Sequence, residues 1–561
     1  MNTNHLWALT HRRWTWPSLV ICGLFLSGQA MAIDRWAAVI EAPPGNNGVQ
    51  LMLLLSDGTV MAQKQGTSSV WYRLTPDVHG SYINGAWTTM APMIYTRQYY
   101  SSAVLRDGRV FVAGGEYGTG GNTAEIYDPR LNTWTEILVP AGLICTSCGG
   151  PGFSDSDCVI LPNGNVMIAP VQPAISNGTV IYNPTLNSFS RGPAYLKNQN
   201  EATWVKLPDD SILTIDATTN PTELNSSERF IPSLNLWIED APLTVPMYNS
   251  AQEIGAGVLL PDKRAFFIGG LGHTAYYTPT GNTNRGSWTQ GPELVKPGVG
   301  WDEPAAMMVN GKVLIQTELG PVVNPRPRAF YEVDPISNTI TQAPDWGDTS
   351  GVSHIMLNLP DGNLLVSYGS STIRVYQPDG VPVPSGKPAI SGITANGDGS
   401  YRLTGTKLNG ISQGSSFGDD AQMDSNYPLV RVTDGDGNVD YLPTYNWSST
   451  SVSTGSKPVS TEFFALQSLT PGEPYSLVAV ANGISSDPVK FYGPVWVDFN
   501  GPFPLQLGTF DFPYHTLAQA TNAVPATGTI NIKTAGHIPE TMTLSKPMTI
   551  VAVGGAVIIG R

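Results

Sequence analysis

The side chains in this sequence that could take part in chemistry are separate carboxylates and a few histidines. Asp155 and Asp157 lie two positions apart, and two carboxyl groups within about 5–10 Å of each other can act as acid and base in glycoside hydrolysis. A solvated loop of Asp and Ser residues is the more ordinary interpretation, and we favour it. His273 follows the end of a Gly-Gly strand, where a single histidine is more often structural than a ligand.

Other acidic residues precede expected first strands of a repeat or lie in a downstream loop. If they converge on one funnel, their carboxylates could bind a cation or a basic ligand. These residues are Glu201, Asp302, Glu303, Asp419 and Asp420.

Side chains with oxygen atoms also alternate at Asp434, Asp436 and Asn438. Calcium takes such ligands, but the segment lacks the Glu that closes a helix-loop-helix calcium site. Gly435 and Gly437 favour a hairpin turn instead. The sequence leaves both interpretations open.

The cysteines indicate an oxidising compartment. Cys22 falls in the N-terminal segment, which leaves Cys145, Cys148 and Cys158. A zinc site needs four ligands, and no second Cys-x-x-Cys pair or neighbouring His completes one. We therefore predict a disulfide between Cys145 and Cys148 in an exposed loop, with one thiol left over.

Composition predicts the elements that must position these residues. The chain has 561 residues and a formal net charge of −14, with no Lys/Arg cluster beyond its first residues, so nucleic-acid binding is not expected. At about 100–200 residues per domain, the length predicts two to four domains. The 59 Gly and 46 Pro, with 14 Trp and 22 Tyr, are typical of an all-β protein with many turns.

The N-terminus has the pattern of an export signal. Arg12 and Arg13 precede a short apolar run over residues 16–26, and Ala30-Met31-Ala32 fits a cleavage site. We predict a signal peptide over residues 1–32, cleaved after Ala32, and a secreted, periplasmic or cell-surface protein. No later stretch is long and apolar enough for a transmembrane segment.

One phrase recurs along the chain: an apolar strand, a tight turn, and a second apolar strand. Asn-Gly and Asp-Gly turns join two strands into a hairpin because they accept positive φ angles. The turns lie between 46 and 56 residues apart, at Asp57-Gly58, Asp107-Gly108, Asn163-Gly164, Asp209-Asp210, Asp262-Lys263, Asn310-Gly311 and Asp361-Gly362.

A second phrase follows most hairpins: an aromatic residue, one residue, Pro, and another aromatic downstream. Tyr127-Asp-Pro129 with Trp134 is an example. It predicts a third and a fourth strand, and seven such units predict a seven-bladed β-propeller. The last unit lacks an outer strand, and Arg35–Ile40 is expected to supply it.

Gly114-Gly115 and Gly269-Gly270, with Tyr and Trp downstream, resemble the kelch repeat. Residues 33–383 resemble the propeller of the galactose oxidase/kelch superfamily. Residues 387–494 are expected to form an immunoglobulin-like (E-set) sandwich, which follows the propeller in that superfamily. Residues 495–561 resemble the entry coil of right-handed parallel β-helices, which need about three coils, so this solenoid segment either docks on another domain or is truncated.

The resemblance implies copper-radical oxidation, which requires a Cys cross-linked to a Tyr, an axial Tyr next to a His, and a second His from the sandwich domain. His354 stands at the axial position, but Ser353 precedes it and Ser415 stands in the sandwich loop. Cys158 lies near the thioether position in a different register. We therefore expect no copper and no other cofactor, with His354 the remaining copper candidate.

The sequence thus favours a secreted or cell-surface, non-catalytic propeller that binds carbohydrate or another extracellular ligand. Trp and Tyr in turns would suit sugar stacking, unless they fill the spaces between blades. One alternative is a galactose oxidase-like enzyme with a rearranged site. A second alternative is a structural extracellular assembly unit.

Overall fold

The computed structural model describes most of the chain from Arg35 onward. The predicted signal peptide, Cys148, Glu201, Asp302, Asp419 and Asp420 lie outside the described residues. Those residues are 35–145, 152–170, 177–197, 203–216, 225–247, 254–295, 303–318, 328–344, 354–367, 369–418 and 421–560.

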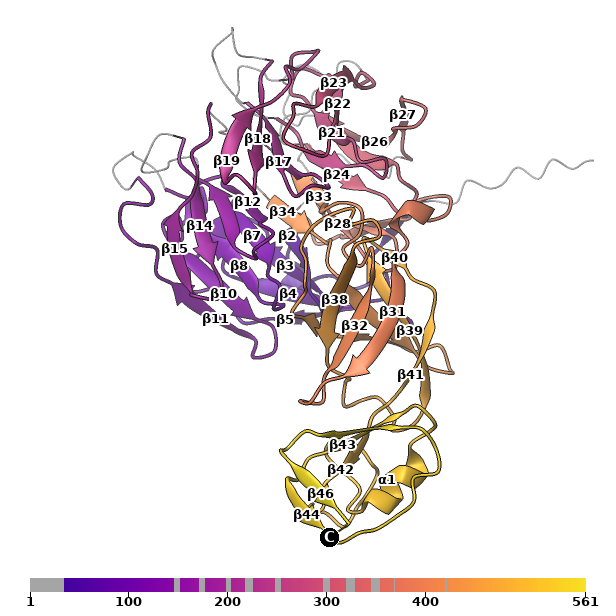
Figure 1. The fold of residues 1–561 in the computed structure, drawn as a ribbon. Helices are drawn as coiled ribbons and strands as arrows, with labels where there is room; N and C mark the ends of the chain where they lie inside the picture. The colour runs from indigo at the N-terminus through magenta and orange to yellow at the C-terminus, as the bar shows by residue number, and fades with distance from the viewer. Residues whose placement is uncertain are drawn as a thin grey trace, which may run out of the picture. The chain divides into compact units, whose positions relative to one another are not determined.

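Antiparallel sheets of four strands follow one another through the first two thirds of the described chain (Figure 1). The first three sheets are β2 (Val49–Leu54), β3 (Val60–Lys64), β4 (Trp71–Thr75) and β5 (Ala86–Thr89); β7 (Ser101–Val104), β8 (Val110–Ala113), β10 (Ala124–Asp128) and β11 (Thr133–Ile137); and β12 (Asp157–Ile160), β13 (Val166–Ala169), β14 (Val180–Asn183) and β15 (Ser188–Arg191).

The next three sheets repeat the same antiparallel order. They are β16 (Trp204–Lys206), β17 (Ile212–Ile215), β18 (Ser227–Ile231) and β19 (Leu236–Glu239); β20 (Gly257–Leu259), β21 (Ala265–Ile268), β22 (Thr274–Thr278) and β23 (Ser287–Gln290); and β24 (Pro304–Met307), β25 (Val313–Glu318), β26 (Arg328–Asp334) and β27 (Thr339–Gln342).

The seventh sheet is closed by the N-terminal strand. It contains β28 (Ile355–Asn358), β29 (Leu364–Ser367), β30 (Arg374–Tyr376) and β1 (Trp36–Ala38), and Trp36 lies opposite Tyr376 in the β1–β30 register. The prediction that Arg35–Ile40 supplies the missing outer strand is confirmed. The closure is apolar, because the Trp36 ring contacts the rings of Phe330 and Tyr376.

The turns between first and second strands explain the repeat. Five of the seven carry Gly with a positive φ angle, such as Gly58 at 76° and Gly108 at 84°, and the other two place Asp210 and Lys263 in the same region. A non-glycine residue there costs backbone energy. The apolar strands on either side, such as Val110–Ala113, are buried on both faces.

A hairpin from beyond the ring fills its centre. The innermost strands contact one another in the order β2, β28, β24, β20, β16, β12 and β7. Strand β33 (Gly414–Phe417) pairs with β24, and β34 (Ala421–Asp424) contacts β2, β7 and β12. Figure 1 shows this orange hairpin among the strands of the ring. The sheet of β24 thereby gains two strands.

The segment that supplies the hairpin has two antiparallel sheets on one shared core. Leu403 and Phe463 of the first sheet pack with Val432 and Leu477 of the second. The sheets are β31 (Ala389–Ala395), β32 (Tyr401–Thr406), β38 (Pro458–Phe463) and β37 (Thr444–Tyr445); and β36 (Val439–Leu442), β35 (Leu429–Thr433), β39 (Pro474–Ala481), β40 (Ile484–Ser485) and β41 (Val489–Tyr492).

This two-sheet segment covers the first-to-second-strand turns on part of the ring. The Tyr441 ring lies against Gly58, and the Val439 N–H donates to the Val78 carbonyl at 2.8 Å. Farther round, the Trp447 N–H donates to the Arg106 carbonyl at 3.1 Å. In the first, second and fifth sheets, whose second-to-third-strand connections are described throughout, antiparallel pairing places those connections at the opposite end of the sheet.

The last described segment has parallel strands. β42 (Val495–Val497), β43 (Thr529–Ile532) and β45 (Thr549–Ala552) stack in register, and β44 (Gly536–Ile538) pairs with β46 (Val557–Ile559). Parallel stacking is what the β-helix resemblance requires, and the β-helix itself stays a prediction.

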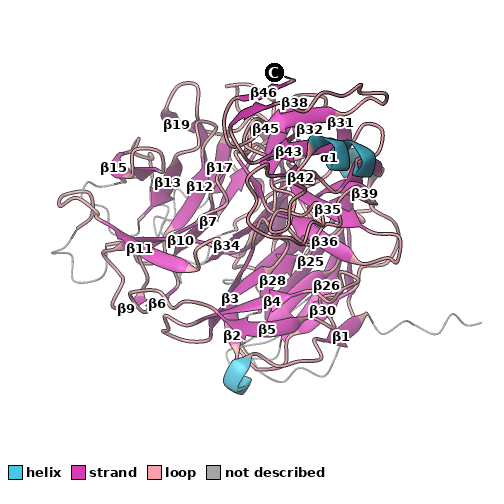
Figure 2. Cartoon of the chain, turned by 90° about the horizontal axis from the view of Figure 1, so that it is seen from below, coloured by secondary structure: helices cyan, strands magenta, loops and turns pink. Residues whose placement is uncertain are grey.

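A short helix covers these parallel strands. α1 (Leu517–Ala523) begins with a capping box between Thr516 and Gln519 and packs beside β42 (Figure 2). The helix has seven residues, far fewer than a bilayer span requires. No helix among the described residues is long and apolar enough to cross a membrane.

The central hairpin generates a stability prediction. Met423 is fully buried and packs with propeller residues in the main core. Met423→Ala is expected to lower the free energy of unfolding by about 2–5 kcal/mol, measured by urea denaturation followed by tryptophan fluorescence. Leu131→Ala, at a position 69% exposed, is the matched control and should change it by less than about 0.5 kcal/mol. Equal effects would show that the hairpin is not part of the core.

Candidate functional site

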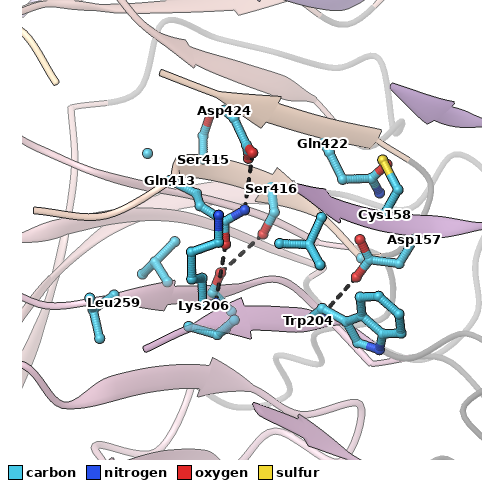
Figure 3. Close-up of a pocket in the computed structure, with 16 residues that line it drawn as sticks. Asp157, Cys158, Trp204, Lys206, Leu259, Gln413, Ser415, Ser416, Gln422 and Asp424 are labelled. Atoms are coloured by element: carbon cyan, nitrogen blue, oxygen red, sulfur yellow. Dashed lines mark hydrogen bonds between the residues drawn. The ribbon is translucent and has the colours of Figure 1, made fainter. Parts of the chain in front are cut away.

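The clearest candidate site lies at the centre of the ring. Strands β12, β16 and β20 and the β33–β34 hairpin line a cavity of about 20 Å³, and Figure 3 shows its polar side chains (Figure 3). Such a space holds about one water molecule. An organic substrate does not fit there.

A buried lysine and a half-buried aspartate face this cavity. Lys206 Nζ donates to the carbonyl oxygens of Ile160 at 2.8 Å and Thr450 at 3.0 Å. Burial lowers the Lys206 pKa, and the charge of Asp424 opposes that effect. Burial raises the Asp424 pKa to about 6, against the stabilising influence of Lys206 and of a 3.0 Å hydrogen bond from Gln413 Nε2.

Asp157 and Cys158 line the same cavity from β12. Asp157 Oδ2 accepts the Trp204 N–H at 2.7 Å, and burial raises its pKa well above the ordinary value. Burial also raises the Cys158 pKa, and its Sγ lies 3.3 Å from the Ser102 carbonyl oxygen. A thiol kept protonated in this way is a poor nucleophile.

The prediction that Asp155 and Asp157 lie in a solvated loop is wrong, because both side chains are buried. Asp155 is 8% exposed and Asp157 is 4% exposed. Asp155 lies beside Ser154 Oγ at 3.4 Å, while Asp157 reaches across to β16. The two carboxyl groups therefore serve different contacts.

His354 directly precedes β28 of the seventh sheet and packs against residues of the sixth sheet. Its ring Nδ1 lies 2.6 Å from Gln316 Nε2, and its backbone N–H donates to Gln316 Oε1 at 2.8 Å. Its ring meets the Phe330 ring edge-on. The side chain is fully buried. Its contacts are those of a packed core histidine.

Glu303 was expected at the rim of a funnel, but it is fully buried. Arg328 Nη1 lies 3.5 Å from its Oε1, and Arg328 also lies 3.9 Å from Glu318. Burial of a carboxylate requires such a partner.

His273 and the alternating Asp residues make local contacts. His273 Nδ1 lies 2.8 Å from Glu293 Oε1 at the end of the fifth sheet. Asp434 Oδ1 accepts the N–H groups of Asp436 and Asn438 at 2.9 and 2.8 Å. That geometry belongs to a hairpin turn, and the described residues contain no group of three or more His, Cys, Asp or Glu side chains suited to a metal.

Among the described cysteines, one is in a disulfide and one is a free thiol, as the sequence predicts. Cys145 is disulfide-bonded, and Cys158 is a free, buried thiol. The predicted partner, Cys148, lies outside the described residues.

The expectation of exposed tryptophans is wrong for the described part of the chain. Trp71, Trp237 and Trp288 are at most 4% exposed, and every described Trp is buried or half-buried. They fill the spaces between sheets, as in the contact of Trp71 with Trp134. Among the tyrosines, Tyr117 is 51% exposed.

Sequence reasoning missed two glutamates at the same position of the repeat. Glu125 is the second residue of β10 and Glu228 the second residue of β18. Each accepts backbone N–H groups from the loop before its sheet: Glu125 from Ile94 at 2.7 Å, and Glu228 from Leu196 at 2.7 Å. The shared phrases Ala-Glu-Ile-Tyr and Ser-Glu-Arg-Phe were the available signal.

The partners of these two glutamates differ. Glu125 forms a buried ion pair with Arg97 at 3.0 Å. Glu228 instead has Asp216 as its neighbour, and burial followed by the charge of Asp216 raises its pKa to about 8. The Glu228–Asp216 pair therefore holds a proton at neutral pH, whereas Glu125 has the guanidinium of Arg97 as its partner.

With this geometry described, the chain can be compared with known proteins. Residues 99–137 match the Kelch motif family, and this stretch covers β7, β8, β10 and β11, one complete sheet of the ring. The chain contains a kelch-repeat β-propeller. The predictions of an all-β class and of a kelch-type propeller are thereby confirmed.

Among curated proteins, the chain is similar to the spermatocyte protein spe-26 of Caenorhabditis elegans. The two are 31% identical over 114 residues, which are 19% of this chain and 18% of that protein. The chain thus matches less than a fifth of the length of that relative, so its whole activity is not carried over.

Among solved structures, similarity is reported to a fungal alcohol oxidase of the AA5 family in complex with copper, at 15% identity over 80% of this chain and 85% of that chain, with a TM-score of 0.37. The structure of YCF48 bound to D1 peptide is 14% identical over 63% of this chain and 99% of that chain, with a TM-score of 0.42. The structure of YjhT is 14% identical over 55% of this chain and 100% of that chain, with a TM-score of 0.37. Such scores are too low to transfer a site or an activity.

The two glutamates generate a pH prediction. Because the Glu228 pKa is raised in the folded state, the stability contribution of the protonated group is lost as pH rises from about 4.5 through about 8. Glu228→Gln should remove that loss. Relative to the natural protein, the variant should gain roughly 2 kcal/mol between pH 5 and pH 8.5, measured by urea denaturation at both pH values.

Glu125→Gln is the matched control at the same repeat position. It leaves Arg97 buried without its charged partner, so it should be destabilised by about 3–5 kcal/mol at both pH values. If Glu228→Gln shows the same pH-independent loss, the proton shared with Asp216 is excluded.

Proposed function

We propose that the chain is an exported, non-catalytic β-propeller protein that binds an extracellular ligand, with carbohydrate as the ligand class. The filled axis of the ring carries the proposal. The β33–β34 hairpin leaves a cavity of about 20 Å³ there, whereas sites for organic ligands measure about 300–1,000 Å³. A ligand would therefore use the loops at the ends of the sheets.

The contacts of the oxidase-like residues support a binding role over the oxidase alternative. His354 is fixed by Gln316, and Ser415 Oγ donates to the Met356 carbonyl at 2.8 Å. Cys158 Sγ lies 3.3 Å from the Ser102 carbonyl oxygen and 3.5 Å from Gln422 Oε1. These described residues do not fit the copper site that the resemblance implies.

Export is supported by two independent features. Residues 1–32 carry the pattern of a cleaved signal peptide, and Cys145 is disulfide-bonded. Disulfides persist in oxidising compartments. A periplasmic, secreted or cell-surface location follows from the proposal.

Copper loading separates the binding protein from the oxidase. After exposure to copper(II) and dialysis, the mature protein is expected to retain much less than one copper per chain, measured by plasma mass spectrometry. It should release no hydrogen peroxide with galactose, primary alcohols or aldehydes in a peroxidase-coupled assay, because the described residues offer no complete ligand set.

His354→Ala provides the control. One tightly held copper per chain, with peroxide release that this substitution abolishes, would overturn the non-catalytic assignment and make His354 a ligand. If the protein binds copper weakly and His354→Ala binds the same amount, the copper is bound at the surface, and this result agrees with the proposal.

A further inference from the structure

We infer that Tyr99 and Tyr117, at the loop end of the second sheet, form a binding platform for a neutral polysaccharide. This inference rests on the proposed function and adds a place and a ligand class to it. The short strands β6 (Arg97–Gln98) and β9 (Tyr117–Gly118) pair here, and Gln98 lies opposite Tyr117 in their register.

The platform is accessible because of its place in the fold. β6 belongs to the connection between the first and second sheets, and β9 lies between β8 and β10. These connections lie at the end of the sheet opposite the Gly58 and Gly108 turns, where Tyr441 and Thr444 make contact. Tyr117 is 51% exposed and Ile94 is 54% exposed.

Tyr99 has a backbone conformation that folding alone does not favour. Its φ angle is +53°, in the left-handed region that a bulky residue rarely adopts. The conformation brings its ring to 6.1 Å from the Tyr117 ring at an interplanar angle of 64°. Glycine would adopt this backbone without strain, so the aromatic ring is retained at a cost.

The platform stands on a rigid base. Arg97 is fully buried, donates to the carbonyl oxygens of Gly120 at 2.6 Å and Thr123 at 3.1 Å, and pairs with Glu125. The Thr96 and Thr119 hydroxyls lie 3.2 Å apart across the two connections. A preformed site loses little entropy when it binds a ligand.

The side chains around the rings indicate the ligand class. Aromatic faces attract the C–H faces of sugar rings, since the ring face carries negative charge. The Glu116 N–H donates to the Tyr99 carbonyl at 3.0 Å, and Gln98 lies opposite Tyr117. The side chains of Glu116 and Gln98 offer acceptor oxygens to sugar hydroxyls. Tyr95 already donates to Glu136 at 3.0 Å.

The acidic character of this surface argues against two other ligands. An anionic polysaccharide would be repelled by Glu116, in a chain of net charge −14. A proline-rich peptide also stacks on aromatic rings, but its carbonyl oxygens need donors, and acceptors predominate here. A neutral polysaccharide meets both requirements.

The test is affinity electrophoresis of the mature protein in native gels. The gels contain hydroxyethylcellulose, xylan, galactomannan or dextran, with polygalacturonate as the anionic comparison. We expect retardation by at least one neutral polysaccharide and none by polygalacturonate. Tyr117→Ala and Tyr99→Gly should each weaken binding about ten-fold, while Tyr117→Phe should retain most of it.

Tyr492→Ala, a half-buried tyrosine of β41, is the matched control and should bind as the natural protein does. Tyr99→Gly keeps the backbone conformation, so loss of binding with an unchanged urea midpoint is a platform effect rather than unfolding. Binding that survives both Tyr117→Ala and Tyr99→Gly overturns the platform and leaves the proposed function standing.

Two further outcomes would overturn the proposal. Retardation by none of the neutral polysaccharides excludes both the platform and carbohydrate as the ligand class. Binding of a fluorescein-labelled decaproline peptide, detected by anisotropy and lost in Tyr117→Ala, with no polysaccharide retardation, would reassign the platform to peptide recognition.

Discussion

The pairing of β33 with β24 is the constraint on which the rest of this molecule depends. One hairpin of the two-sheet segment becomes the innermost part of a propeller sheet and packs its buried Phe417 and Met423 into the main core. The ring is therefore closed twice, at its edge by β1 and at its axis by the hairpin. Because the axis is filled, little space for a ligand remains there, and accessible side chains lie at the ends of the sheets.

The repeat gives each sheet the same frame and lets single positions diverge. Glu125 and Glu228 occupy one position and bind loop N–H groups in the same way, yet one is neutralised by Arg97 and the other shares a proton with Asp216. Burial makes both arrangements obligatory, since an isolated carboxylate in a dry core is costly. The same Arg97 anchors the connections that carry Tyr99 and Tyr117, so one buried ion pair links core stability to an exposed aromatic surface.

Much of the fold followed from local patterns. Asp-Gly turns, apolar runs and the aromatic-x-Pro phrase predicted the sheets and the closing strand at Arg35–Ile40, because turn chemistry and strand burial are properties of neighbouring residues. The capping box between Thr516 and Gln519 is likewise a property of neighbouring residues. The site was less predictable: Asp155, Asp157 and Glu303 were assigned to solvated positions, and the tryptophans to exposed turns, because exposure depends on what another segment places over a residue.

The sequence by itself determined an all-β repeat protein with hairpin units. Only the tertiary structure decided which carboxylates are charged, which histidines are free to bind, and where an aromatic surface remains open. Those properties depend on contacts between distant segments, such as the Ser102 Oγ–H donating to the Gln422 carbonyl across 320 positions. No local pattern encodes such a contact, because desolvation and charge pairing are set by three-dimensional neighbours rather than by neighbours along the chain.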